Sequence, residues 1–265
     1  MLVIDNGGDA GTAEVLRRSW SVPLVHHVAG RNLGCGGGLA AGERMALERF
    51  SELTHCWILD DDAVVTPPAL GKMLAALEHE NADVAHALVL DGSGTLGWPP
   101  GMKNRAVQRL MKLRQTPAEF RTRCGADPLP LDWAQGIALL VTRRALDELG
   151  LHRDDYWVRG EDLEFSLRIT HRFRGIYVPL AEVAHLPPAG SSGGSQKEEF
   201  LKHAAMLQNV AYTTARLPHG RRLLHTLLPN WLRFFRTWGV KPRVAIAAAG
   251  AFWKGAILGR PAGHR

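Results

Sequence analysis

The chain has 265 residues, of which 46% are hydrophobic and 22% charged, and its formal net charge is +6. This composition excludes a disordered or fibrous chain, and the length suits one domain of the size that enzymes commonly have, with an appendage. The three cysteines are scattered and form no CxxC pair, which argues against a disulfide framework or a structural zinc site.

Strands and helices are expected to alternate through the first half of the chain. Apolar or β-branched runs predict strands over residues 2–5, 23–28, 56–59 and 83–88. Amphipathic patterns predict helices over residues 11–18, 38–50 and 68–78. This order indicates an α/β domain with a mixed, mostly parallel sheet flanked by helices.

The second half of the chain continues with less regular spacing. After a Gly/Pro-rich loop over 92–101, we expect strands over 133–142 and 175–179 and helices over 104–113, 144–149, 161–171 and 198–216. Residues 187–195 read as a flexible loop, because they are rich in Gly, Ser and Pro.

The C-terminal segment differs in charge from the rest of the chain. Residues 216–265 hold ten Lys or Arg and no Asp or Glu. Leucines and a tryptophan recur there at helical spacing (Leu223, Leu224, Leu227, Leu228 and Trp231), and we expect Pro229 and Pro242 to divide the segment into short helices. We therefore divide the chain into a catalytic domain over 1–215 and a basic amphipathic helical extension over 216–265.

Three carboxylates end the strand of the sequence WILDDDAVV. The carboxyl edge of an α/β sheet is where ligands bind. On extended backbone Asp60 and Asp62 would share a side while Asp61 faces the other, because side chains alternate. Two carboxylates on one side suit Mg²⁺ or Mn²⁺, although a solvated acidic turn would also explain the triplet.

Three further patterns carry weaker signals. In GEDLEF, Glu161 and Asp162 begin a helix, where acids are favoured by the helix dipole and where a general base could also stand. His185 follows a strand and could ligate Mn²⁺. The glycines around Gly34 precede a helix but fit neither dinucleotide nor Walker spacing, so a tight turn explains them as well as anion binding does.

Taken in order, the motifs resemble the family 2 inverting glycosyltransferases of the GT-A fold, most closely the bacterial galactofuranosyl- and rhamnosyltransferases. The resemblance covers residues 2 to about 216 and rests on VIDNGG, NLGCGGGLAAG, WILDDDA, DWAQGIALLVTRR, GEDLEFSLR and His185. It implies that Asp60, Asp62 and His185 hold the metal and that Asp162 is the catalytic base. Substrate or donor contacts are expected of Asp61, Asn32, Gly34, Trp133 and Glu161.

The resemblance also implies partners and location. The donor would be a UDP- or dTDP-linked sugar, galactofuranose or rhamnose, and the acceptor a glycan or polyprenyl-linked hydroxyl of the bacterial cell envelope. No run approaches the roughly 18 apolar residues of a membrane span, and no signal peptide is recognisable. We therefore expect a cytoplasmic protein whose basic extension binds an anionic membrane at the inner face of the plasma membrane, with no nucleic acid partner.

The sequence departs from the family at two places. Family members begin with another strand and a loop that hold the nucleotide base, so we expect the natural product to begin upstream of Met1, or this chain to be a weakly active copy. The paired Trp of galactofuranosyltransferases is also unmatched, since Gly136 and Ile137 occupy the corresponding positions beyond Trp133.

Three alternatives remain open on the sequence alone. A metal-dependent nucleotidyltransferase also uses paired carboxylates at a sheet edge. An inactive, truncated homologue could act as a binding protein. A nucleic-acid binder could use the Arg and Trp residues of the basic extension.

Overall fold

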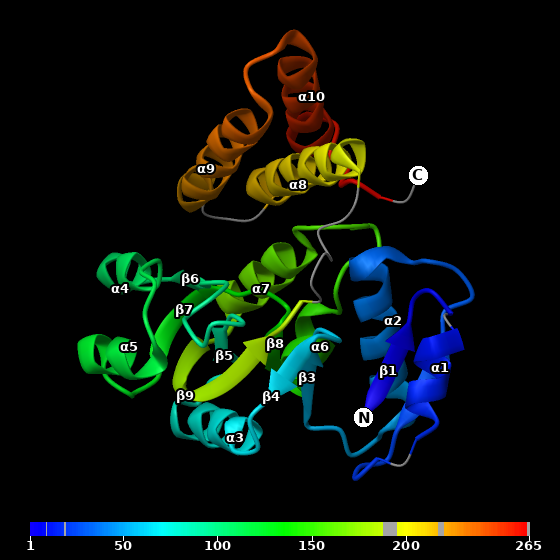
Figure 1. The fold of residues 1–265 in the computed structure, drawn as a ribbon, viewed down its shortest axis with the longest axis vertical. Helices are drawn as coiled ribbons and strands as arrows, with labels where there is room; N and C mark the ends of the chain where they lie inside the picture. Colours follow the sequence, from blue (N-terminus) through cyan, green and yellow to red (C-terminus); the bar gives the residue numbers. More distant parts are fainter. Residues whose placement is uncertain (9, 19, 188–194, 217–219, 264–265) are drawn as a thin grey trace. The chain divides into compact units, whose positions relative to one another are not determined.

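The computed structural model describes residues 1–8, 10–18, 20–187, 195–216 and 220–263 (Figure 1). The chain forms two compact units. The first comprises Met1–Ser51, Leu151–Glu164 and Gly194–Arg265, and the second comprises Glu52–Gly150 and Phe165–Gly193. Of the loop expected over 187–195, residues 188–194 lie outside the described residues.

A mixed sheet forms the centre of the second unit (Figure 1). Its strands follow the order β3-β8-β5-β9-β7-β6, and β4 pairs with β9. They are β3 (His55–Leu59), β4 (Ala63–Val65), β5 (Val84–Leu90), β6 (Gly101–Met102), β7 (Leu129–Trp133), β8 (Ala138–Thr142) and β9 (Gly175–His185).

The direction of the strands corrects one expectation. Within this sheet β5 and β9 are parallel, whereas the pairs β3–β8, β5–β8, β4–β9, β7–β9 and β6–β7 are antiparallel. The sheet is mixed as expected, but the expectation of mostly parallel pairing is wrong for it. The reason is that β8 and β7 lie on either side of the parallel pair β5–β9, and each of them runs opposite to the strand that it contacts.

Helices cover the sheet of the second unit, and α3 packs against β5 and β9. The helices are α3 (Ala69–His79), α4 (Arg105–Leu110), α5 (Pro117–Cys124), α6 (Arg143–Leu149) and most of α7 (Glu161–Arg172). Residues 84–89 of β5 are all buried, which suits a central strand covered on both faces. Buried side chains of α3, β5, β8 and β9 pack together in one hydrophobic core.

The first unit contains a smaller parallel pair and the C-terminal helices. β1 (Leu2–Asp5) pairs directly with β2 (Val25–Val28), and α1 (Ala10–Leu16) connects the two strands along the chain. α2 (Gly34–Arg49) packs against β1. The buried Glu43 of α2 accepts hydrogen bonds from the backbone N–H of His152 and from its ring Nδ1, each at 2.7 Å. This buried pair ties α2 to the segment before α7.

Three helices end the chain: α8 (Gln196–Arg216), α9 (Gly220–Trp238) and α10 (Pro242–Phe252), followed by a π-helical turn over Trp253–Ile257. α8 packs against both α9 and α10 (Figure 1). Pro242 begins α10, where its missing N–H costs nothing, as expected. Pro229 lies inside α9, so the expectation that it would end a helix is wrong; the aromatic cluster between α8 and α9 offsets the missing hydrogen bond.

Several element boundaries differ from the sequence prediction for local reasons. The expected strand over 133–142 is the end of β7, a loop and then β8. Helix α5 was not expected, although Thr116 and Glu119 form a capping box that the sequence displays. Strand β9 continues past Pro179, where we expected it to end.

Candidate functional site

The Asp triplet lies in a tight turn at the end of β3. The strand ends at Leu59, and the N–H of Ala63 donates to the carbonyl of Asp60 at 3.2 Å. The expected grouping of Asp60 with Asp62 is present, but the reason given for it, alternation on extended backbone, is wrong. The turn joins β3 to β4 and reverses the direction of the chain, and this brings the carboxylates of Asp60 and Asp62 together.

His185 reaches the turn through strand pairing. β4 and β9 are antiparallel with Ala63 opposite His185, and the N–H of Leu186 donates to the carbonyl of Asp62 at 2.9 Å. Directly opposed residues in a sheet have neighbouring side chains. The register of this short ladder therefore places the imidazole beside the acidic turn.

The side chains of the three predicted metal ligands, Asp60, Asp62 and His185, lie close together in one group. His185 Nε2 lies 2.8 Å from Asp62 Oδ1 and 3.4 Å from Asp60 Oδ2. One ligand atom from each residue lies within 4.8 Å of the other two. His185 is buried, Asp62 is half-buried, and the side chain of Asp60 is 43% exposed, so the group opens to solvent on the side of Asp60. Asp61 is exposed.

The chemistry of this group fits a divalent cation. Partial burial raises the pKa of the Asp60 carboxyl; the nearby charges of Asp62 and Asp61 also raise it, while His185 opposes them. Asp62 Oδ1 is buried and makes no hydrogen bond within the described residues, even though His185 Nε2 is near it. A cation between these atoms would relieve the crowding of negative charge, and two carboxylates with one imidazole suit Mn²⁺ or Mg²⁺.

A bulge in β9 sets the position of His185. The pairing with β5 shifts register between Ala87 and Leu88, which are opposite Val178 and Glu182 respectively. The extra residues include Pro179, which has no N–H to donate and is tolerated at a bulge. β9 therefore continues through this bulge to His185 instead of ending.

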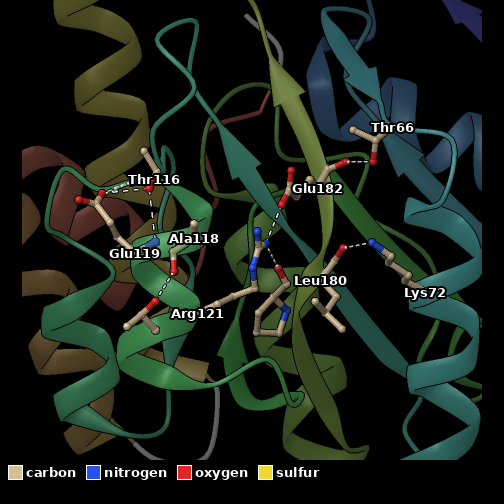
Figure 2. A network of polar contacts seen from close by, with 10 residues as sticks. Thr66, Lys72, Thr116, Ala118, Glu119, Arg121, Leu180 and Glu182 are labelled. Carbon is tan, nitrogen blue, oxygen red and sulfur yellow. Dashed lines mark hydrogen bonds and ion pairs between the residues drawn. The ribbon is translucent and has the colours of Figure 1, made fainter.

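Side chains from α3, α5 and the loop before α3 hold the bulge (Figure 2). Arg121 Nη1 donates to the carbonyl of Pro179 at 3.1 Å and to Glu182 Oε1 at 2.6 Å. Figure 2 shows Thr66 and Lys72 approaching from the other side, where they donate to the carbonyls of Glu182 at 2.8 Å and Leu180 at 2.9 Å. These bonds satisfy backbone carbonyls that the sheet cannot pair, and so fix the path of β9 towards His185.

The predicted base lies at the start of α7, in the first unit. Asp162 is half-buried, its Oδ1 accepts a hydrogen bond from the N–H of Leu163 at 2.7 Å, and Glu161 is 7% exposed. The preceding residues Arg159 and Gly160 both have left-handed backbone, with φ of 58° and 102°. A non-glycine residue in that region is uncommon and marks a backbone held by its surroundings.

Asn209 of α8 holds this strained turn. Its buried side chain donates to the carbonyl of Arg159 at 2.8 Å and accepts from the N–H of Ala262 at 2.6 Å. A Cβ on Gly160 would lie 3.1 Å from the Cβ of Asn209. Helix α8 thus fixes where α7 begins, and with it the direction of Asp162.

Asn32 and Gly34 shape the start of α2. The N–H of Gly34 donates to Asn32 Oδ1 at 2.8 Å, and the N–H of Cys35 donates to the carbonyl of Trp157 at 2.9 Å. Gly34 has φ +74°, and a Cβ there would lie 2.3 Å from the carbonyl oxygen of Trp157. The first N–H groups of the helix are thus bound within the protein, which favours the tight-turn interpretation of the glycines over anion binding.

Trp133 ends β7 and lies over the neighbouring strand. It pairs with Gly101 of β6, and a Cβ on Gly101 would lie 2.0 Å from the indole Nε1. The glycine is required there because the indole occupies the space of a side chain. Trp133 is half-buried and belongs to the same unit as the Asp60–Asp62–His185 group.

Comparison with known proteins gives a family and a fold. Residues 1–128 match the family described as "Glycosyl transferase family 2". No curated protein sequence matches the chain. Among solved structures, S. aureus TarS in complex with UDP-GlcNAc is similar with a TM-score of 0.59 at 14% identity, over 94% of this chain and 69% of that one.

A second solved structure, GalNAc-T7 with UDP, GalNAc and Mn²⁺, is similar with a TM-score of 0.55 at 16% identity, over 86% of this chain. The present chain covers 48% of that protein, which is about half its length. At these identities the likeness establishes the fold, a mixed sheet flanked by helices of the GT-A type.

Proposed function

Residues 1–128 of the chain belong to glycosyl transferase family 2, and from this premise we propose that the protein is a metal-dependent, inverting glycosyltransferase. It moves a sugar from a nucleotide diphosphate to a hydroxyl of a glycan or lipid-linked acceptor. The observation that carries the proposal is the group of Asp60, Asp62 and His185, which the turn after β3 and the β4–β9 ladder bring together. The UDP and UDP-GlcNAc bound in the similar structures support a nucleotide-linked sugar as donor.

Each residue type has a task in such a reaction. Asp60, Asp62 and His185 would hold the cation, which supplies positive charge to the diphosphate leaving group. Asp162 accepts the proton of the acceptor hydroxyl. At the same time the hydroxyl oxygen bonds to the anomeric carbon, and the bond from that carbon to the diphosphate breaks. This single displacement inverts the anomeric carbon and requires no protein nucleophile.

The remaining predicted contacts are part of the proposal. Asp61 is exposed beside the metal group, where it can face the donor nucleotide, and Trp133 offers an indole for the substrate. Glu161, which precedes Asp162, is proposed as a further contact to the substrate or donor. Asn32 and Gly34 act by shaping the loop before α2. The motif resemblance supports galactofuranose or rhamnose as the sugar, with UDP or dTDP as carrier.

The test is an assay of the full chain with MnCl₂ or MgCl₂, UDP- and dTDP-linked sugars and a polyprenyl-linked acceptor. Release of the nucleoside diphosphate with transfer of the sugar, and inversion of the anomeric carbon by NMR, are the expected results. Release of pyrophosphate would instead support the nucleotidyltransferase alternative. Donor binding without turnover of any sugar would support the inactive binding homologue.

The C-terminal helices suit a peripheral position on an anionic membrane. None of the helices in the described part of the chain is long and apolar enough to cross a bilayer. One face of α10 is buried, yet Ile246 of α10 and Trp253 and Ile257 of the π-helical turn after it are 72%, 56% and 54% exposed. Such a group of exposed apolar residues on a segment without acidic residues is typical of helices that lie in a membrane surface.

We therefore propose an apolar face that extends further along the chain than the sequence suggested, in addition to Leu228 of α9, which is 58% exposed. Trp231 is half-buried in the cluster between α8 and α9, and Leu223 and Leu224 lie outside the described side chains. Exposed Arg243 and Lys254 lie near the exposed apolar residues of α10 and the π-helical turn in sequence and can meet lipid phosphates. We place the protein in the cytoplasm at the inner face of the plasma membrane, without a nucleic acid partner.

A further inference from the structure

We propose that Trp98 is a positioning residue that fixes the imidazole of His185 so that Nε2 faces Asp60 and Asp62. The inference rests on the proposed metal function of that group. It concerns a residue from the Gly/Pro-rich loop over 92–101, where no local pattern indicates a role.

Trp98 contacts His185 directly. The two ring centroids are 4.2 Å apart, and the ring planes are nearly perpendicular, at 88°. Edge-to-face contacts of this kind have a preferred geometry and resist rotation of either ring. The indole also packs against the core of the second unit, so it is not free to move away from the imidazole.

His185 lacks the usual means of orientation. A histidine that ligates a metal generally donates its other ring N–H to a carboxylate, a carbonyl or water, which fixes both tautomer and ring angle. Here Nδ1 is buried, and within the described residues it has no hydrogen-bond partner. Packing must therefore hold the ring at the angle that directs Nε2 to the carboxylates, and the indole of Trp98 provides this packing.

The backbone of Trp98 is built for this contact. Its φ is 40°, a left-handed conformation that is unusual for a bulky residue and energetically unfavourable. The residues on each side hold it there: Gly97 donates its N–H to the carbonyl of Val89 at 2.9 Å, and the carbonyl of Pro99 accepts from Gln135 Nε2 at 3.1 Å. Trp98 thus has a strained backbone, its two neighbours are fixed by hydrogen bonds, and its ring contacts a proposed metal ligand. This combination indicates a positioning role.

The experiment measures the affinity of the full chain for Mn²⁺ alone, from the EPR signal of free Mn²⁺, and the unfolding midpoint by circular dichroism. Trp98→Ala should weaken Mn²⁺ binding about tenfold, in the range found when the groups that orient metal ligands are removed. Trp98→Phe, which keeps an aromatic ring, should remain within about threefold of the wild type. Phe120→Leu removes a fully buried aromatic ring of the same unit that packs edge-to-face on Tyr177, and it should lower stability without changing Mn²⁺ affinity.

A double-mutant cycle separates positioning from general destabilisation. If Trp98 acts through His185, Trp98→Ala should have no further effect on Mn²⁺ affinity in a His185→Ala background. Should Trp98→Ala fail to fold, Trp98→Leu serves in its place, because it retains apolar volume but lacks a ring.

The possible outcomes are distinct. Equal Mn²⁺ affinity of the wild type and the Trp98 variants, with loss in Asp62→Asn, would overturn the role of Trp98 and leave the metal site intact. Equal losses from Trp98→Ala with and without His185 would also overturn it. A wild-type chain that does not bind Mn²⁺ would overturn the metal proposal and this inference with it.

Discussion

Ala63 and His185 are directly opposed in the antiparallel ladder between β4 and β9, although most of the second unit separates them along the chain. Asp62 precedes Ala63, so the same pairing places its carboxylate 2.8 Å from His185 Nε2. The candidate metal group thus depends on strand register as well as on its three side chains. A slip of one residue in β9 would move the imidazole to the other face of the sheet.

Loss of one carboxylate should remove cation-dependent donor binding. We expect Asp62→Asn to weaken UDP binding in MnCl₂ by at least about 100-fold, because several kcal/mol of diphosphate stabilisation depend on the cation. His185→Ala should show a smaller loss. Calorimetry of UDP with and without MnCl₂ measures this, with Asp147→Asn, an exposed carboxylate on α6, as the charge-matched control. Unchanged Mn²⁺-dependent affinity in Asp62→Asn would contradict the assignment.

The proposed base should affect turnover and leave donor binding unchanged. Asp162→Asn is nearly isosteric but cannot accept a proton, so kcat should fall by roughly 10²–10⁴-fold with little change in UDP affinity. Steady-state kinetics and calorimetry on the same preparation test this. The rivals on the same turn are Glu161 and Glu164. Normal turnover by Asp162→Asn together with an inactive Glu161→Gln would move the base to Glu161.

Two glycines with similar backbone allow a matched test of the close approach before α2. Gly30 has φ +69°, and no atom lies within 4 Å of the place that a Cβ would take, whereas at Gly34, with φ +74°, the Cβ would lie 2.3 Å from Trp157. Gly30→Ala should lower the free energy of unfolding by only about 1–2 kcal/mol, which is the strain of a side chain on left-handed backbone. Gly34→Ala should cost at least about 2 kcal/mol more, because α2 must separate from the segment at Trp157. Urea unfolding curves of the two variants give the difference, and equal losses would show that the close approach is absent in solution.

His86 should make the protein sensitive to acid. It is fully buried in β5, and burial lowers its pKa from an ordinary 6.5 to about 4. Between these values the unfolded chain binds a proton that the folded chain does not, so the stability contribution is complete above pH 6.5 and is lost as the pH falls towards 4. The loss is on the order of 3 kcal/mol.

The measurement for His86 is the free energy of unfolding of the wild type and His86→Leu at several pH values. The variant should show a flatter dependence between pH 6.5 and 4, while His79→Gln, whose side chain is exposed, should follow the wild type. Parallel curves for the wild type and His86→Leu would mean that His86 titrates normally in the folded protein.

The exposed apolar residues of α10 and of the π-helical turn after it should govern membrane binding. In co-sedimentation at low salt we expect the chain to bind phosphatidylglycerol vesicles and not phosphatidylcholine vesicles. Trp253→Ser with Ile257→Ser should reduce binding several-fold, because it removes exposed apolar area, and Leu113→Ser, an exposed leucine of the second unit, should not. Failure to bind either vesicle, or salt-sensitive binding of DNA in preference to anionic vesicles, would contradict the proposal.

Much of the site could be predicted from local sequence. The strand before the Asp triplet, the helix that begins at Glu161 and the strand leading to His185 are all present, because apolar periodicity and Gly/Pro positions set them locally. The motif order then suggested which side chains form the metal group. Local reasoning was wrong where tertiary contacts replaced a local rule, as at Pro179 inside β9 and Pro229 inside α9.

The sequence by itself determined which chemical groups are present and at which ends of strands and helices they stand. Only the tertiary structure decided which atoms meet, because the β4–β9 register and the bulge held by Arg121, Thr66 and Lys72 join distant segments. Trp98 is the clearest case, since its place in a Gly/Pro-rich loop carries no sign of a role. Its contact with His185 exists because bonds from β5 and from Gln135 hold a strained backbone in place, and no local pattern encodes such long-range pairing.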